Sequence, residues 1–192
     1  MKPAVFLDRD GVLTNLVLNP KTGEYEPPHR VEDLVLVPGA ILALHILQDA
    51  GFELFLVSNQ PDYAKGKTSL EQIRAIHEKF DFILKEEGVQ FREYYYCYHH
   101  PRGIIPEYSF ACSCRKPNPY FLFKAAEDYG IDLARSWMIG DRDTDVQCGK
   151  AAGTRTIQIL EPRSAIYRGF GNPDYRAQTF LEAVEIIIEE LR

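Results

Sequence analysis

Short apolar runs alternate along the chain with longer segments in which apolar residues recur every three or four positions. The short runs end abruptly at polar residues, which is typical of buried strands, and the longer periodic segments indicate helices. The predicted strands are Ala4–Leu7, Glu53–Ser58, Glu93–Tyr98, Ser136–Gly140 and Thr154–Leu160. The predicted helices are Gly39–Ala50, Ser69–Glu87, Pro119–Tyr129, Thr144–Ala152 and Thr179–Leu191. Strands that alternate with helices predict an α/β fold with a central parallel sheet and helices on both faces.

Two stretches, 15–37 and 99–119, do not fit this alternation, and we expect both to be loops. The first contains an Asn-Pro and a Pro-Pro pair. The second carries several cysteine and histidine residues. Loops of this length inside a compact domain are usually functional or disordered, so both are candidates for a role at a binding site.

The bulk composition fits one soluble globular domain over 1–192. Hydrophobic residues make up 45% of the chain and charged residues 26%. The net charge is −6, the isoelectric point is about 5.4, and no basic run occurs, which argues against nucleic acid as a partner. The apolar run 186–188 is far too short to cross a bilayer, so we expect no membrane partner. We also expect the protein to be cytoplasmic and a monomer.

The first strand ends in Asp8 and Asp10, two carboxylates spaced two apart and followed by Gly11. Two acids at the end of a buried strand suit phosphoryl chemistry. One can act as nucleophile and the other as general acid/base, with a cation beside them. The alternative is a solvated turn, in which Asp and Gly are common.

Polar groups also stand at three further places along the chain: after the second predicted strand, at the end of the 99–119 loop before a helix, and after the fourth predicted strand. The segments are Ser58-Asn59-Gln60, Arg115-Lys116-Pro117 and Gly140-Asp141-Arg142-Asp143-Thr144-Asp145. In a parallel sheet these ends share one edge, where ligands bind. Together they offer a hydroxyl, a lysine and a further acid for Mg²⁺, which suffices for phosphoryl transfer. Each piece alone has a plain structural alternative: Ser58 and the acids after residue 140 could cap helices, and Lys116 could be solvated.

Three of the four cysteines flank the 99–119 loop, in a Cys97-Tyr98-His99 and a Cys112-Ser113-Cys114 pattern. Three thiolates and one imidazole form a tetrahedral Zn²⁺ set with no open position, which predicts a structural zinc. His100 is an alternative to His99 as the fourth ligand. Buried cysteines that act as small hydrophobes are the alternative reading, and we expect that role for Cys148.

The motifs 7–11, 58–60, 115–117 and 140–145 resemble those of the haloacid dehalogenase (HAD) superfamily of phosphohydrolases. The resemblance implies a HAD-like Rossmannoid three-layer sandwich. It also implies that Asp8 is the nucleophile that forms an aspartyl-phosphate, and that Asp10 is the general acid/base. Ser58 and Lys116 would stabilise the phosphoryl group. Asp8, the Asp10 carbonyl and Asp141 would bind Mg²⁺.

The zinc loop, 97–114, narrows the resemblance to the D-glycero-D-manno-heptose 1,7-bisphosphate 7-phosphatases, whose loop the histidinol-phosphate phosphatases share. This group is essentially capless, and the resemblance selects His99 as the zinc ligand. It further implies that the substrate is contacted by four side chains: Asn59, Gln60, Arg115 and Arg142. A second phosphate on a small phosphorylated metabolite would give the two arginines a partner.

The sequence departs from that family pattern in the long loop after Asp10, at Thr14, and at Pro61-Asp62-Tyr63. We therefore predict a Mg²⁺-dependent phosphatase that acts on the 7-phosphate of the heptose bisphosphate. Histidinol phosphate or another small sugar phosphate is the alternative within this class. A phosphotransferase or mutase, and a non-catalytic zinc-binding interaction module, are the alternatives outside it.

Overall fold

The computed structural model describes residues 1–192. Six parallel strands form the sheet in the order β5-β4-β1-β6-β7-β8. The strands are β1 (Ala4–Leu7), β4 (Glu53–Asn59), β5 (Glu93–Cys97), β6 (Trp137–Gly140), β7 (Arg155–Ile159) and β8 (Tyr175–Ala177). The helices are α1 (Ala40–Asp49), α2 (Leu70–Glu86), α3 (Tyr120–Tyr129), α4 (Asp143–Ala152) and α5 (Phe180–Glu189). The predicted parallel sheet is confirmed, with β8 as an addition.

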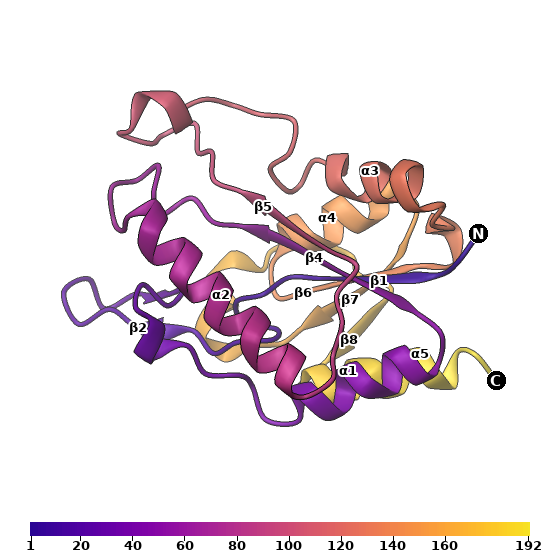
Figure 1. The fold of residues 1–192 in the computed structure, drawn as a ribbon. Coiled ribbons are helices and arrows are strands. Elements are labelled where there is room, and N and C mark those ends of the chain that lie inside the picture. The colour runs from indigo at the N-terminus through magenta and orange to yellow at the C-terminus, as the bar shows by residue number, and fades with distance from the viewer.

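The sheet is the middle layer of a three-layer sandwich (Figure 1). Helices α3 and α4 cover one face, and α1, α2 and α5 cover the other. The central strand shows why both faces are apolar. Val5 and Leu7 belong to the core beneath α1 and α5, while Ala4 and Phe6 belong to the core beneath α3 and α4. Successive side chains of a strand point to opposite faces, so a strand buried on both sides is apolar throughout.

The helix ends follow the capping residues in the sequence. Ser69 accepts a hydrogen bond from the Gln72 amide, and Thr179 accepts one from the Glu182 amide. Both residues therefore precede their helices as N-caps rather than form the first helical turn. Gly153, with a φ of 81°, ends α4 in the left-handed conformation that favours glycine.

The sequence predicts a loop over 15–37, but the structure shows short regular elements there. It contains the antiparallel hairpin of β2 (Val17–Leu18) and β3 (Tyr25–Glu26), followed by a 3-10 turn at Val31–Asp33. These elements are too short for hydrophobic periodicity to predict. The stretch 99–119 is a loop with one 3-10 turn at Pro106–Tyr108.

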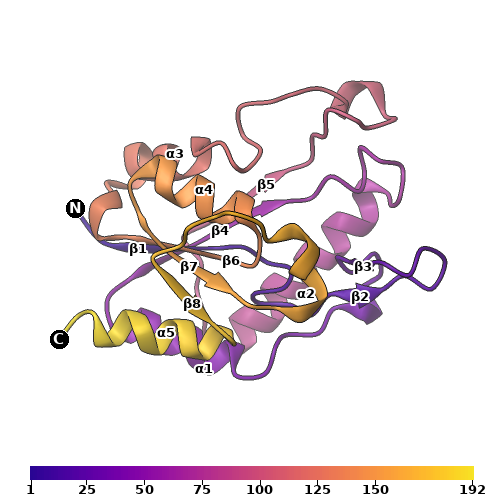
Figure 2. The ribbon, with the colours of Figure 1, turned by 180° about the vertical axis from the view of Figure 1, so that it is seen from behind.

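The hairpin and the 99–119 loop project from the same side of the molecule, opposite both chain termini (Figures 1 and 2). This side holds the carboxyl ends of the parallel strands. The two insertions therefore stand beside the edge at which ligands bind in such sheets. None of the helices combines the length and apolar character needed to cross a membrane.

Candidate active site

Asp8 follows β1 and is paired with a buried lysine from a distant part of the chain. The Lys116 Nζ lies 3.1 Å from Asp8 Oδ1 and 2.7 Å from Asp145 Oδ1, and it donates to the Val57 carbonyl at 2.6 Å. Burial lowers the pKa of Lys116, but the two carboxylates outweigh it and raise the pKa above its ordinary value. The lysine therefore remains a cation in the interior, next to the expected nucleophile.

Three carboxylates gather at this point: oxygens of Asp8, Asp141 and Asp145 lie within 4.8 Å of one another. Asp141 is fully buried, and neither of its carboxylate oxygens has a hydrogen-bond partner. Burial, with Asp145 and Asp8 nearby, raises the pKa of Asp141 to about 7. A buried unpartnered carboxylate is costly, and a divalent cation with oxygen ligands would offset the cost. Asp141 and Asp8 therefore fit Mg²⁺, whereas Asp145 is already paired with Lys116.

Two glycines make room for this acid cluster. Gly11 has a φ of 83°, and a Cβ there would lie 2.5 Å from Asp141 Oδ2. A Cβ at Gly140 would overlap the Asp145 side chain. Asp145 itself also caps α4, because its carboxylate accepts a hydrogen bond from the Arg142 amide at 3.0 Å. The cap that the sequence offered as an alternative role for Asp145 is thus present, and the residue also pairs with Lys116. We call Asp8, Lys116, Asp141 and Asp145 the centre.

The carboxyl end of β4 and the residue after it, Ser58 to Gln60, hold other residues of the site in place. Asn59 exchanges two hydrogen bonds of 3.1 Å with the Lys116 backbone, one through its amide nitrogen and one through its oxygen. The Gln60 side chain donates to Ser58 Oγ at 3.0 Å and to Asp10 Oδ2 at 2.6 Å. Ser58 and Gln60 are buried and are not among the residues that line the cavity, whereas Asn59 is.

The Asp10 carboxylate contacts three side chains that all donate to it, from Arg9, Thr14 and Gln60. Our sequence-based assignment did not include Arg9. The only sequence signal for it is its position between the two acids. Thr14 is fully buried, and its hydroxyl reaches back to the turn that starts at Asp8.

A cavity of about 330 Å³ opens over Asp8, Asp10 and Lys116. Its lining is strongly polar. Six basic side chains besides Lys116 line it: Lys65, Lys67, His100, Arg102, Arg115 and Arg142. Arg115 and Arg142 were predicted as substrate contacts, and the other four were not. We call Lys65, Arg102, Arg115 and Arg142 the rim cations.

Lys65 is surrounded by other positive charges of the cavity. Burial, together with Lys67, Arg115 and Arg142, lowers the pKa of Lys65, although Asp62 acts in the opposite direction. Positive charges that depress one another's protonation favour an anion between them. The opposite part of the lining comes from the hairpin, with Glu24, Tyr25 and Glu26. The cavity thus combines groups that suit phosphate with acceptors that suit hydroxyls.

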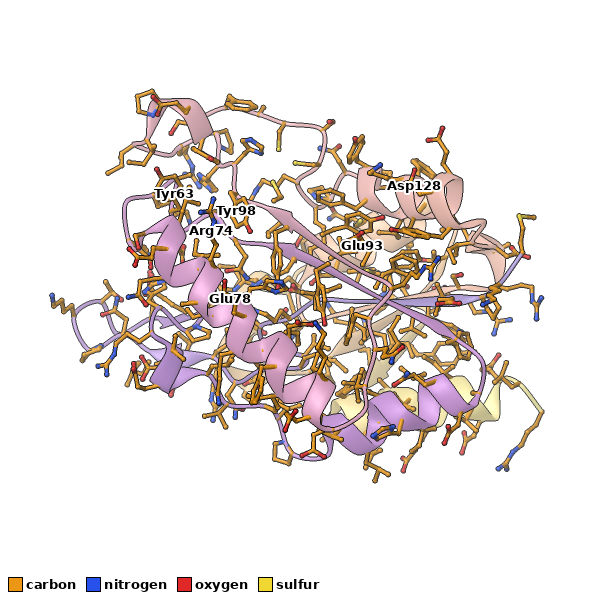
Figure 3. All side chains as sticks on the ribbon, viewed as in Figure 1. Tyr63, Arg74, Glu78, Glu93, Tyr98 and Asp128 are labelled. Carbon is orange, nitrogen blue, oxygen red and sulfur yellow. The ribbon has the colours of Figure 1, made fainter.

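Charge pairs and aromatic contacts hold the loops around the cavity. His29 Nε2 lies 2.8 Å from Asp62 Oδ2, and Lys67 is paired with Glu26 on the hairpin. The rings of Tyr63 and Tyr108 meet edge to face at 5.0 Å, which joins the segment after β4 to the 99–119 loop. Figure 3 shows Tyr63 beneath that loop, close to the N-terminal end of α2. The rim is therefore one connected structure.

The cysteine and histidine residues of the zinc prediction come together. The Sγ atoms of Cys97 and Cys112 are 3.5 Å apart, those of Cys112 and Cys114 are 3.4 Å apart, and His99 Nδ1 lies 3.6 Å from Cys114 Sγ. Tetrahedral zinc with Zn–S bonds of about 2.3 Å sets its sulfurs roughly 3.8 Å apart, so the cluster suits a metal ion. His100 lies outside it, since its Nδ1 accepts a backbone hydrogen bond and its side chain lines the cavity.

Comparisons with known proteins agree with this arrangement. A family model described as HAD-hydrolase-like matches residues 113–182. A solved structure titled D,D-heptose 1.7-bisphosphate phosphatase from B. bronchiseptica, complexed with magnesium and phosphate, has a TM-score of 0.78 at 24% identity. The alignment covers 99% of both chains. The fold is thus that of the HAD-like structures.

Two curated relatives specify the family. A D-glycero-beta-D-manno-heptose-1,7-bisphosphate 7-phosphatase of Yersinia pestis is 37% identical over 81% of this chain and 79% of its own length. A D-glycero-D-manno-heptose-1,7-bisphosphate 7-phosphatase of Thermosynechococcus vestitus is 36% identical over 99% of this chain and 97% of its own. The chain therefore belongs to the D-glycero-D-manno-heptose-1,7-bisphosphate 7-phosphatase family, and it is a phosphoric monoester hydrolase.

Proposed function

We propose that the chain removes the 7-phosphate of D-glycero-D-manno-heptose 1,7-bisphosphate by way of an aspartyl-phosphate on Asp8. The observation that carries this proposal is one cavity with two kinds of phosphate partner. Asp8 and Lys116 line it next to the acid cluster, and four rim cations line it elsewhere. A substrate with two phosphates can meet both sets at once. A monophosphate such as histidinol phosphate would leave the rim cations unpaired.

In the first step an Asp8 carboxylate oxygen attacks the phosphorus of the 7-phosphate. The bond from phosphorus to the sugar oxygen breaks, and Asp10 gives its proton to that oxygen. Lys116 is well placed to neutralise the phosphoryl oxygens, because it is held 3.1 Å from Asp8. Mg²⁺, held by Asp8, the Asp10 carbonyl and Asp141, would supply further charge neutralisation as a Lewis acid.

In the second step water attacks the phosphorus of the aspartyl-phosphate. Asp10, now a carboxylate, takes the proton from that water, and the bond between phosphorus and the Asp8 oxygen breaks. Inorganic phosphate leaves, and Asp8 is restored as a carboxylate. The same group thus serves as acid and then as base, which balances the protons over the cycle.

The other residues have supporting roles in this proposal. The family resemblance gives Ser58 the role of a phosphoryl contact, and in the structure its hydroxyl is buried behind the cavity lining, where it accepts a hydrogen bond from Gln60. Asn59 positions Lys116 through its two backbone hydrogen bonds. Arg115 and Arg142 bind the second phosphate. Gln60 acts on Asp10 rather than on the substrate, because its amide hydrogens are directed to Asp10 and Ser58.

We further propose that Zn²⁺ binds Cys97, His99, Cys112 and Cys114 as a structural ion. All four ligand positions would be filled by protein, so the ion would anchor the loop that leads to Arg115 and Lys116. Three reduced thiols at one site suit the cytoplasm. The whole chain acts as one hydrolase domain over 1–192, as a monomer.

The proposal is tested by phosphate release from purified protein with Mg²⁺ and the heptose bisphosphate as either anomer. Phosphorus NMR identifies which phosphate is lost. We expect loss of the 7-phosphate and higher kcat/KM than with histidinol phosphate. Asp8→Asn should lower kcat on the order of 10⁴-fold or more, as removal of a nucleophile does in other enzymes. Equal activity of wild type and Asp8→Asn would contradict the mechanism.

A further inference from the structure

We propose that Arg9 is the positioning residue for Asp10, and that it holds the Asp10 carboxylate apart from the charge network around Asp8. The inference rests on the proposed function, in which Asp10 carries the proton. Arg9 does not line the cavity, and its side chain is only 1% exposed. It therefore acts through Asp10 rather than on the substrate.

The contacts between the two side chains form a fork. Arg9 Nε donates to Asp10 Oδ1 at 3.0 Å, and Arg9 Nη2 donates to Oδ2 at 3.1 Å. Thr14 Oγ1 donates to Oδ1 at 3.0 Å, and Gln60 Nε2 donates to Oδ2 at 2.6 Å. Each carboxylate oxygen thus accepts two hydrogen bonds, which is the arrangement of deprotonated Asp10, the form that takes the proton from water in the second step. When Asp10 is protonated for the first step, one of these donors gives way to its hydroxyl while the rest of the fork keeps its plane. Bidentate pairing of this kind fixes the plane of the carboxylate as well as its position.

Arg9 is itself held firmly. Its guanidinium lies over the Tyr96 ring, 5.9 Å from the ring centroid, and its backbone carbonyl accepts hydrogen bonds from Leu13 and Thr14. The third guanidinium nitrogen, Nη1, has no partner. A buried cation with an unsatisfied donor lowers the stability of the fold unless an ion pair offsets the cost. Asp10 is the acid with which it is paired.

The two acids of the Asp8-Arg9-Asp10 turn thus have separate cations. Lys116 pairs with Asp8 and Asp145, and Arg9 pairs with Asp10. Asp10 is absent from the cluster of acids that fits a metal. Without Arg9, the Asp10 carboxylate would lose its paired cation and two of the four hydrogen bonds that fix it. It would then be free to turn away from the oxygen of the leaving group.

A double-mutant cycle tests this inference. Arg9→Met keeps the length of the side chain and removes the fork, and it is made in the wild type and in Asp10→Asn. The substrates are glycerol phosphate, whose leaving group needs a proton, and p-nitrophenyl phosphate, whose leaving group does not. With glycerol phosphate we expect kcat to fall about 10- to 100-fold and KM to change less than about threefold. The pre-steady-state burst of p-nitrophenol should change less than about threefold.

In the Asp10→Asn background, Arg9→Met should add less than about a twofold further loss, because residues that act as a unit are not additive. Multiplicative losses in that background, or equal losses with both leaving groups, would overturn the inference. Thr14→Val is the second variant, since it removes one donor and no charge. It should lower kcat with glycerol phosphate about three- to tenfold and show the same non-additivity. If Arg9→Met does not fold, Thr14→Val replaces it in the double-mutant cycle with Asp10→Asn.

The two proposals fail in different ways. If the proposed function is wrong, the wild type itself does not hydrolyse the heptose bisphosphate. If only the Arg9 inference is wrong, the wild type hydrolyses phosphomonoesters and the cycle is additive. Circular dichroism of each variant checks that the comparison is made between folded proteins.

Discussion

The centre and the rim of the cavity are built from different parts of the chain. The centre draws Asp8 and Asp141 from residues that directly follow buried strands, Asp145 from the first turn of α4 and Lys116 from the end of the 99–119 loop, and its atoms are almost fully enclosed. The rim draws its cations mostly from long loops, which are held by charge pairs, aromatic contacts and the cysteine cluster. In the proposed function the centre carries the chemistry and the rim sets the choice of substrate. The two regions are therefore expected to respond separately to substitution.

Of the substitutions that distinguish the centre from the rim, Lys116→Met is expected to lower activity most. The substitution leaves the acids of the centre without their protein cation, so kcat should fall on the order of 10²- to 10³-fold with every phosphomonoester. Steady-state kinetics on the heptose bisphosphate and on p-nitrophenyl phosphate measure it. A loss of kcat with the bisphosphate alone would show that Lys116 acts in substrate choice, as the rim cations do, and not in the chemical step. Melting curves with Mg²⁺ present control for the lost buried charge pair.

Zinc removal should affect the rim first and the centre indirectly. Cys112→Ser takes away one proposed ligand, and the loop that leads to Arg115 should loosen. We expect the melting temperature to fall by about 5 °C or more, together with faster proteolysis within 99–119. Cys148→Ser is the matched control, because that thiol is buried outside the cluster. Metal analysis of gently purified protein that finds no zinc would contradict the proposal.

The smallest effect is expected at the pair of His29 and Asp62, which joins the hairpin to the segment after β4. The hydrogen bond to Asp62 raises the pKa of His29, although burial opposes it. The stabilisation is therefore fully present below the ordinary histidine pKa of about 6.5 and is lost as pH rises through the raised value. His29→Asn should cost up to about 1 kcal/mol near pH 6 and less near pH 9, measured by urea unfolding. An equal cost at both values would exclude the charged pair.

Much of the centre could be predicted from the sequence, because each of its motifs is local and adjoins a strand or helix with a clear pattern. Asp145 was the exception. A helix cap was an alternative role for it and no site role was assigned, and only the fold shows that it pairs with Lys116. A role for Arg9 was not predicted either, because nothing in the sequence shows that its side chain donates to Asp10.

The rim was harder to predict. Lys65 and Arg102 lie on segments without hydrophobic periodicity, and their meeting depends on the paths of two loops. The hairpin strands β2 and β3 have two residues each, and β8 has three, which is too short for a pattern to form. The cysteine cluster was predictable because the spacing of thiols is itself the signal.

The most direct test of this division is the double variant Arg115→Met/Arg142→Met, assayed on the heptose bisphosphate and on p-nitrophenyl phosphate. If the rim sets substrate choice and the centre does the chemistry, KM for the bisphosphate rises about 10- to 100-fold, the value of one or two charge-assisted hydrogen bonds. Turnover of p-nitrophenyl phosphate stays within about twofold of wild type, since it has no second phosphate. Equal losses with both substrates would contradict the separation of centre and rim.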